Sequence, residues 1–64
     1  MNRQEFLDFV SRNFYIGGDA MRLIDNILVY AEKDVSPDDR KAFLTAMLNG
    51  TIGLTDEEIR QISL

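Results

Sequence analysis

The side chains that could perform acid–base chemistry are carboxylates in two short runs. Asp38 and Asp39 form one run, and Asp56, Glu57 and Glu58 form the other. Two carboxylates act as general acid and general base when burial raises the pKa of one of them. Both runs fall where a helix is expected to begin, and helix capping and the helix dipole account for acidic residues there. We therefore expect solvated carboxylates and not a catalytic pair.

Nucleophilic catalysis would depend on Ser11, Ser36 or Ser63. A serine nucleophile needs an adjacent base, and the chain contains neither histidine nor cysteine. A domain of this size also has little room for an enclosed substrate pocket. We expect no enzymatic activity, no catalytic residue, no cofactor and no small-molecule substrate.

The region after the central helix resembles the start of a calcium-binding loop. Asp34, Ser36 and Asp38 place oxygen atoms at alternate positions, but the position that needs glycine is Asp39. The twelfth position, which needs a bidentate glutamate, is Thr45. A zinc site without cysteine or histidine would have only carboxylate ligands, which is a poor structural set. The sequence therefore predicts no metal site, and the region reads as the start of a helix.

Charge and the double glycine give little support to a nucleic-acid or phosphate ligand. The net charge is −4, and the seven lysine and arginine residues form no run. Neutralised phosphates supply most of the affinity of nucleic-acid binding, so we do not expect direct binding of nucleic acid. Gly17 and Gly18 lack the spacing of a phosphate loop, and Asp19 places a negative charge where a phosphate would bind.

Length and composition indicate one small folded domain. The chain has 64 residues, of which 45% are hydrophobic, so we expect a single helical domain over residues 1–64. No disulfide can form, and stability must come from regular helix packing or from burial by self-association. No apolar run approaches the length of a membrane span, and the beginning of the sequence has no signal-peptide pattern. We expect a cytoplasmic protein that does not contact a membrane.

Apolar residues recur at helical spacing, which predicts an all-α fold: a small bundle of three main helices plus a short C-terminal fourth helix. The central element is the helix at 19–33, because its apolar arc is wide enough to contact neighbours on two sides. Asp19 is its expected N-cap. A first helix is expected at about 2–14. The third is expected from Pro37 to about Asn49, with Ser36 as N-cap and Gly50 as C-cap. The fourth is expected from Asp56 to about Ile62, after a capping box formed by Thr55 and Glu58.

The same periodicity predicts which residues are buried. Ile24, Ile27 and Leu28 are expected to be fully buried between the first and third helices, and Leu23 lies on the same apolar arc. Arg40 falls within the apolar arc of the third helix, and we expect its head group to reach a nearby acid at position 32, 34 or 38. The residues of the third helix that are expected to point inward are Phe43, Leu44, Met47 and Leu48.

Several apolar residues are left over once the core has been assigned. Val29 lies within the polar arc of the central helix, and Tyr30 lies at the rim of the apolar arc. Tyr15 and Ile16 are apolar residues in a loop, where they would either cover the helix ends or contact a partner. The partner-contact candidates are Phe6, Phe9, Tyr15, Ile16, Val29 and Tyr30. The alternative for the phenylalanines is that they fill the core, and the alternative for Val29 is a singly exposed valine.

Three functions remain open at this point. We expect a non-catalytic protein-interaction module that binds a protein partner or a second copy of itself as a homodimer. The alternative is a small acidic regulator or accessory subunit of a nucleic-acid-handling complex, acting through the acidic residues at 32–39 and 56–58. The third is a weak nucleic-acid binder that uses Arg3, Arg12, Arg22 and Arg60.

Overall fold

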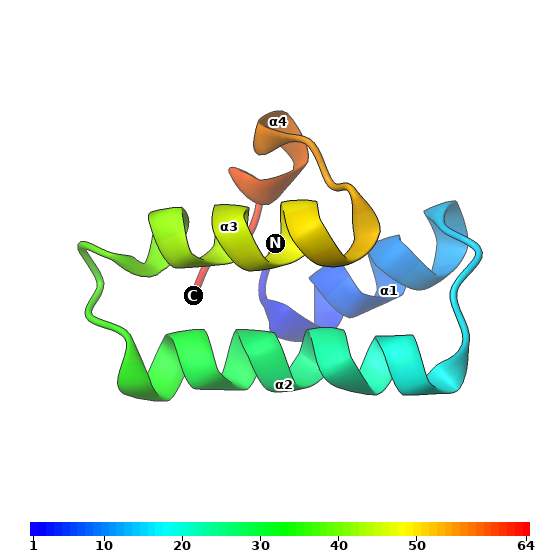
Figure 1. The fold of residues 1–64 in the computed structure, drawn as a ribbon, viewed down its shortest axis with the longest axis horizontal. Helices are drawn as coiled ribbons and strands as arrows, with labels where there is room; N and C mark the ends of the chain where they lie inside the picture. The colour runs from blue at the N-terminus through cyan, green and yellow to red at the C-terminus, as the bar shows by residue number, and fades with distance from the viewer.

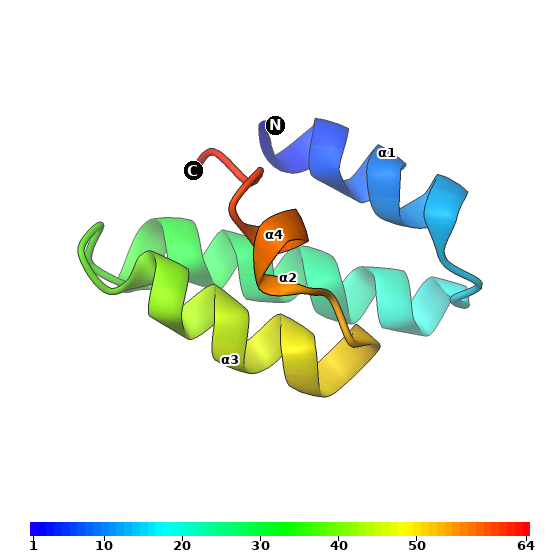
Figure 2. The ribbon, with the colours of Figure 1, turned by 90° about the horizontal axis from the view of Figure 1, so that it is seen from above.

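Four helices and no strand make up the fold, in a computed structural model that describes residues 1–64. The helices are α1 (Arg3–Asn13), α2 (Gly18–Asp34), α3 (Arg40–Ile52) and α4 (Asp56–Ile59). α2 and α3 run antiparallel, and α4 lies on the side of α3 that faces away from α2 (Figure 1). Viewed from above, α1 and α3 lie on opposite sides of α4 (Figure 2). The predicted all-α bundle with a short C-terminal fourth helix is confirmed.

The core is entirely hydrophobic, and α2 is at its centre. Ile24, Ile27 and Leu28 are 0%, 5% and 0% exposed, which confirms the prediction that they are buried. α2 packs against both α1 and α3. The remaining core residues are Phe6, Val10, Ala31, Leu44, Leu48, Leu54, Ile59 and Ile62. No polar or charged side chain is buried among them, so the core requires no side-chain hydrogen bond.

Capping boxes begin both α1 and α4. At α4 the Glu58 N–H donates to Thr55 Oγ1 at 3.2 Å and the Thr55 N–H donates to Glu58 Oε1 at 3.0 Å, which confirms the predicted box. The Asn2 and Glu5 pair forms the equivalent bonds at α1, with distances of 2.8 Å and 3.0 Å, and this second box was not predicted. α4 ends at Ile59, earlier than predicted, and a turn follows it.

The predicted starts of α2 and α3 are wrong by a few residues. α2 begins at Gly18 with Gly17 as its N-cap, so Asp19 lies in the first turn, where its charge still complements the helix dipole. Residues 37–39 form a turn and not the first turn of α3. The Ser36 hydroxyl donates to Asp39 Oδ2 at 3.0 Å, so it is not used as a cap, and α3 begins only at Arg40.

The end of α3 was also placed too early. Gly50 is inside the helix, and the residue in left-handed conformation is Gly53, with φ of 70°. A left-handed glycine commonly ends a helix because it has no Cβ to clash with the turn. The additional turn of α3 allows Ile52 to pack against the core. It also brings the Thr51 hydroxyl to the Met47 carbonyl, at 2.6 Å.

Arg40 joins α3 to the end of α2, but through backbone carbonyls and not through the acids that were expected. Its Nε donates to the Ala31 carbonyl at 2.8 Å, and its Nη2 donates to the Glu32 carbonyl at 2.6 Å. Nη1 lies 3.5 Å from the carbonyl of Leu64. The last carbonyls of a helix have no partner within the helix. Arg40 therefore satisfies the C-terminal end of α2 and fastens it to α3 and to the end of the chain.

Candidate protein-interaction surface

Four of the six predicted contact residues are buried or partly buried. Phe6 is 0% exposed and belongs to the core, so the alternative that it fills the core is the correct one. Phe9 and Ile16 are half-buried and pack against the core. The Phe9 ring lies between two others, with its centroid 6.1 Å from that of Phe6 and 6.3 Å from that of Phe14. Val29 is half-buried and does not stand exposed within the polar arc.

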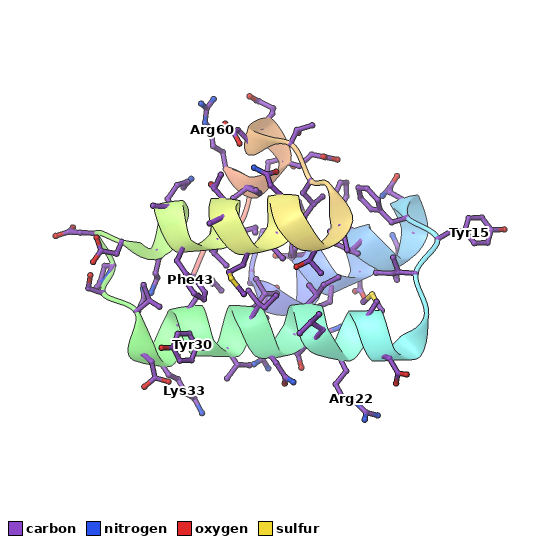
Figure 3. All side chains as sticks on the ribbon, in the orientation of Figure 1. Tyr15, Arg22, Tyr30, Lys33, Phe43 and Arg60 are labelled. Carbon is purple, nitrogen blue, oxygen red and sulfur yellow. The ribbon has the colours of Figure 1, made fainter.

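The two tyrosines are exposed but lie far apart. Tyr15 is fully exposed in the α1–α2 connection, so the expectation that it covers the helix ends is wrong. Tyr30 is 52% exposed near the other end of α2. Figure 3 shows the two rings at opposite ends of the molecule. The structure therefore does not bring the six predicted residues together into one surface.

A different apolar surface forms around Tyr30, on the side where α2 lies beside α3. The rings of Tyr30 and Phe43 are adjacent, with centroids 5.4 Å apart, and both are visible on the near side in Figure 3. Leu23, which lies on the apolar arc of α2, is 48% exposed, and Met47 is 39% exposed although it was expected to point inward. We call this surface the α2–α3 face. It consists of Leu23, Tyr30, Phe43, Ala46, Met47 and Gly50.

Helical spacing explains how two helices supply one face. Leu23 and Tyr30 are seven residues apart, and so are Phe43 and Gly50, which places each pair on one side of its helix. Tyr30 lies beside Phe43 at one end of the face. Because α2 and α3 are antiparallel, Leu23 is then expected to lie beside Gly50 at the other end. None of the six residues of the face carries a charge. These side chains are suited to apolar contacts with another surface.

The side of α2 that faces α1 carries mainly polar and charged residues. A hollow of about 430 Å³ lies between α1 and α2, and it is open to solvent. Arg3 Nε lies 3.6 Å from Asp25 Oδ1 across this groove, and both side chains are more than 40% exposed. The lining residues are Gln4, Leu7, Asp8, Ser11, Met21, Arg22 and Asp25. Five of the seven lining residues are polar or charged, and none of them is a predicted contact residue.

The two acidic runs lie on separate parts of the molecule. Asp34, Asp38 and Asp39 are exposed around the α2–α3 connection, whereas the 56–58 run is the first turn of α4 (Figure 1). No three acidic side chains are grouped so that they could hold a metal ion. Glu58 is engaged in the capping box. The acidic residues at 32–39 and at 56–58 therefore do not form one continuous surface.

Comparison with protein-family models, with curated proteins and with solved structures found no match to this chain. None of the four helices has the combination of length and apolar composition that crossing a membrane requires.

Proposed function

We propose that this protein is a non-catalytic protein-interaction module and that its contact surface is the α2–α3 face. One observation supports this most directly: Leu23, Tyr30 and Met47 are all substantially exposed. Helical spacing and the contact between the Tyr30 and Phe43 rings place them on one side of the α2–α3 pair. Single exposed apolar residues are common on protein surfaces and need no explanation. A contiguous group of them, bordered by polar residues, is characteristic of a surface that another protein covers.

The distribution of charge around the face supports the same proposal. Charged residues are depleted at the centre of protein–protein interfaces, because removing a charge from water is costly unless it is paired. On α2 the charged residues nearest to the face are Asp19 in the first turn of the helix and Lys33 and Asp34 in its last turn. A partner could therefore cover the middle of the face without burying a charge.

Other ligand classes fit the face less well. A small molecule needs a concave pocket with a few convergent polar groups, and the face is formed by two adjacent helices without such groups. A net charge of −4 repels nucleic-acid phosphates. The role of an acidic regulator stays a prediction from the sequence, and the separation of the two acidic runs does not favour it.

Site-specific photo-cross-linking tests the proposal. A photoreactive amino acid is introduced at Leu23 or Met47, and at Gln61 as a matched exposed control away from the face. In cells that produce the protein, we expect covalent protein adducts from positions 23 and 47 and none from position 61. Equal yields at all three positions, or no adduct from the face, would contradict the proposal.

A further inference from the structure

We propose that the occupant of the α2–α3 face is a second copy of this chain, in a two-fold dimer that packs the α2 helices of the two copies antiparallel. This inference rests on the proposed function, because it takes the same face to be the contact surface. It adds the identity of the partner and the alignment of the two copies. The argument for a second copy is that the face is complementary to itself.

The first observation is a regular row of exposed residues along α2. Asp19, Leu23, Asn26, Tyr30 and Lys33 are spaced four, three, four and three residues apart, and all five are exposed. Alternating spacings of three and four are those with which one helix packs along another. The row runs on the side of α2 that faces away from the buried Leu28, so it is not needed for the core.

The second observation is the symmetry of that row about Asn26. A two-fold rotation through Asn26 brings Asp19 beside the second copy's Lys33, and Leu23 beside the second copy's Tyr30. Asp19 and Lys33 form no ion pair within the chain, and the Asn26 side chain forms no hydrogen bond there. The helix dipole explains the signs of the two terminal charges. It does not explain the apolar residues between them or the central asparagine, which in helix pairs fixes the register.

The third observation comes from α3. Gly50 lies inside the helix, where glycine is unfavourable, and a Cβ added there would meet nothing within 4 Å. The monomer therefore gives no reason for a glycine at this position. Because Tyr30 lies beside Phe43 and the two helices are antiparallel, Met47 is expected opposite the middle of α2. The same rotation then places the Phe43 ring of one copy over Gly50 of the other. An aromatic ring facing a position without a side chain is complementary in shape, and in a two-fold interface it occurs twice.

The size of the face is sufficient for a weak dimer. α2 has 17 residues, so the face is about 25 Å long, and two adjacent helices make it about 20 Å wide. Such a face would bury about 500 Å² per copy, or about 1,000 Å² in total, which is near the lower limit for a specific interface. We therefore expect a dissociation constant on the order of 10 to 100 µM.

Sedimentation equilibrium of the purified chain over about 1 µM to 1 mM tests the inference. We expect the mass to rise from that of a monomer to that of a dimer. Leu23→Glu and Gly50→Leu should each weaken the dimer by about tenfold or more, while Gln61→Glu should not. Gly50→Leu is informative because Gly50 is exposed and a Cβ added there meets no atom within 4 Å in the monomer.

A charge exchange tests the antiparallel alignment specifically. Lys33→Glu places like charges beside Asp19 of the second copy, so it should weaken the dimer by about tenfold. Adding Asp19→Lys to the same chain should restore the affinity to within about threefold of wild type, because a positive residue 19 then again lies beside a negative residue 33 of the second copy. A dimer that the double variant does not restore, or that the face variants do not weaken, contradicts the inference.

A failure of this inference is distinguishable from a failure of the proposed function. If the wild type is monomeric at every concentration while positions 23 and 47 still give adducts with another protein, the second copy is the wrong occupant and the α2–α3 face remains a contact surface. If the purified protein is monomeric and no adduct forms, both proposals are wrong.

Discussion

The two sides of α2 present different kinds of side chain. Toward α1, its groove is lined mainly by polar and charged side chains, and Asp25 is paired with Arg3 across it. Toward solvent beside α3, the same helix exposes Leu23 and Tyr30 with no charge between them. On the first side the buried Asp25 Oδ1 has no hydrogen-bond partner but lies beside the Arg3 guanidinium, and the other polar residues that line the groove are exposed to water. The second side leaves apolar surface in contact with water.

This contrast shows that the length of the chain does not by itself explain the exposed face. A domain of this size has a small core and cannot cover every apolar residue. Yet the chain places Arg22 and Asp25 along the groove between α1 and α2 and keeps charged residues out of the middle of the α2–α3 face. A face reserved for contact with another protein would have this distribution, since a charge at its centre would oppose association.

The largest expected effect compares two leucines of the same helix. Leu28 is 0% exposed and Leu23 is 48% exposed. Leu28→Ala should reduce the free energy of unfolding by about 2–5 kcal/mol, since it removes buried methyl groups and leaves a cavity. Leu23→Ala should reduce it by less than about 1 kcal/mol, because much of that side chain is already in water.

Urea denaturation at low micromolar protein concentration, where the monomer is the main species, measures both values. Equal losses for the two variants would mean that Leu23 is buried in solution and that the exposed face does not exist. A loss of unfolding free energy that is several times larger for Leu28→Ala than for Leu23→Ala would confirm that one side of α2 is core and the other is surface.

The sequence predicted the helices well because helical periodicity is a strong signal. The wide apolar arc of α2 correctly identified Ile24, Ile27 and Leu28 as buried. Helix ends were less accurate, because several residues competed for the same role. Gly50 and Gly53 are both plausible C-caps, and only the packing of Ile52 against the core selects the later one.

The candidate surface could not be predicted from the sequence, for a geometric reason. Periodicity places Leu23 on the apolar arc but does not say how far the neighbouring helix covers that arc. Ile27 and Leu23 lie on the same arc, yet Ile27 is 5% exposed and Leu23 is 48% exposed. The row at 19, 23, 26, 30 and 33 could have been read from the spacing alone, but it has meaning only once the structure shows that all five residues are exposed.

The second largest effect concerns the way α2 is fastened to α3. Arg40→Met keeps most of the aliphatic stem but removes the donors to the Ala31 and Glu32 carbonyls, so we expect a loss of about 1–3 kcal/mol. Arg40→Lys should recover only part of it, since an ammonium group cannot donate to several carbonyls in the planar geometry of a guanidinium. Hydrogen exchange should accelerate first in the last turn of α2. A variant Arg40→Met as stable as wild type would show that these bonds are replaced by water without cost.

A smaller effect, with the opposite sign, is expected at Gly50. In the monomer Gly50→Ala should increase the free energy of unfolding by about 0.5–1 kcal/mol, since alanine is the better helix former and its Cβ meets no atom within 4 Å. Gly53→Ala is the matched comparison, because φ of 70° makes a Cβ unfavourable there and the variant should be less stable. Thermal unfolding of both variants at low protein concentration shows whether each one is more or less stable than wild type. A destabilised Gly50→Ala variant would mean that the position is constrained within the monomer.

The smallest effect is expected from the ion pair on the α1 side of α2. Arg3 Nε and Asp25 Oδ1 are 3.6 Å apart. Asp25 Oδ1 itself is buried, but both side chains as a whole are more than 40% exposed, so the surrounding water screens much of their attraction. A double-mutant cycle with Arg3→Gln and Asp25→Asn should therefore give a coupling free energy of at most about 1 kcal/mol. That coupling should fall further between about 0.05 M and 1 M NaCl. The charge exchange at Asp19 and Lys33 provides the comparison, because that pair should affect association and leave the stability of the monomer nearly unchanged. A coupling well above this limit, or one that salt does not reduce, would mean that the α1 side of α2 is drier than the structure indicates. The two sides of the helix would then differ less than we infer.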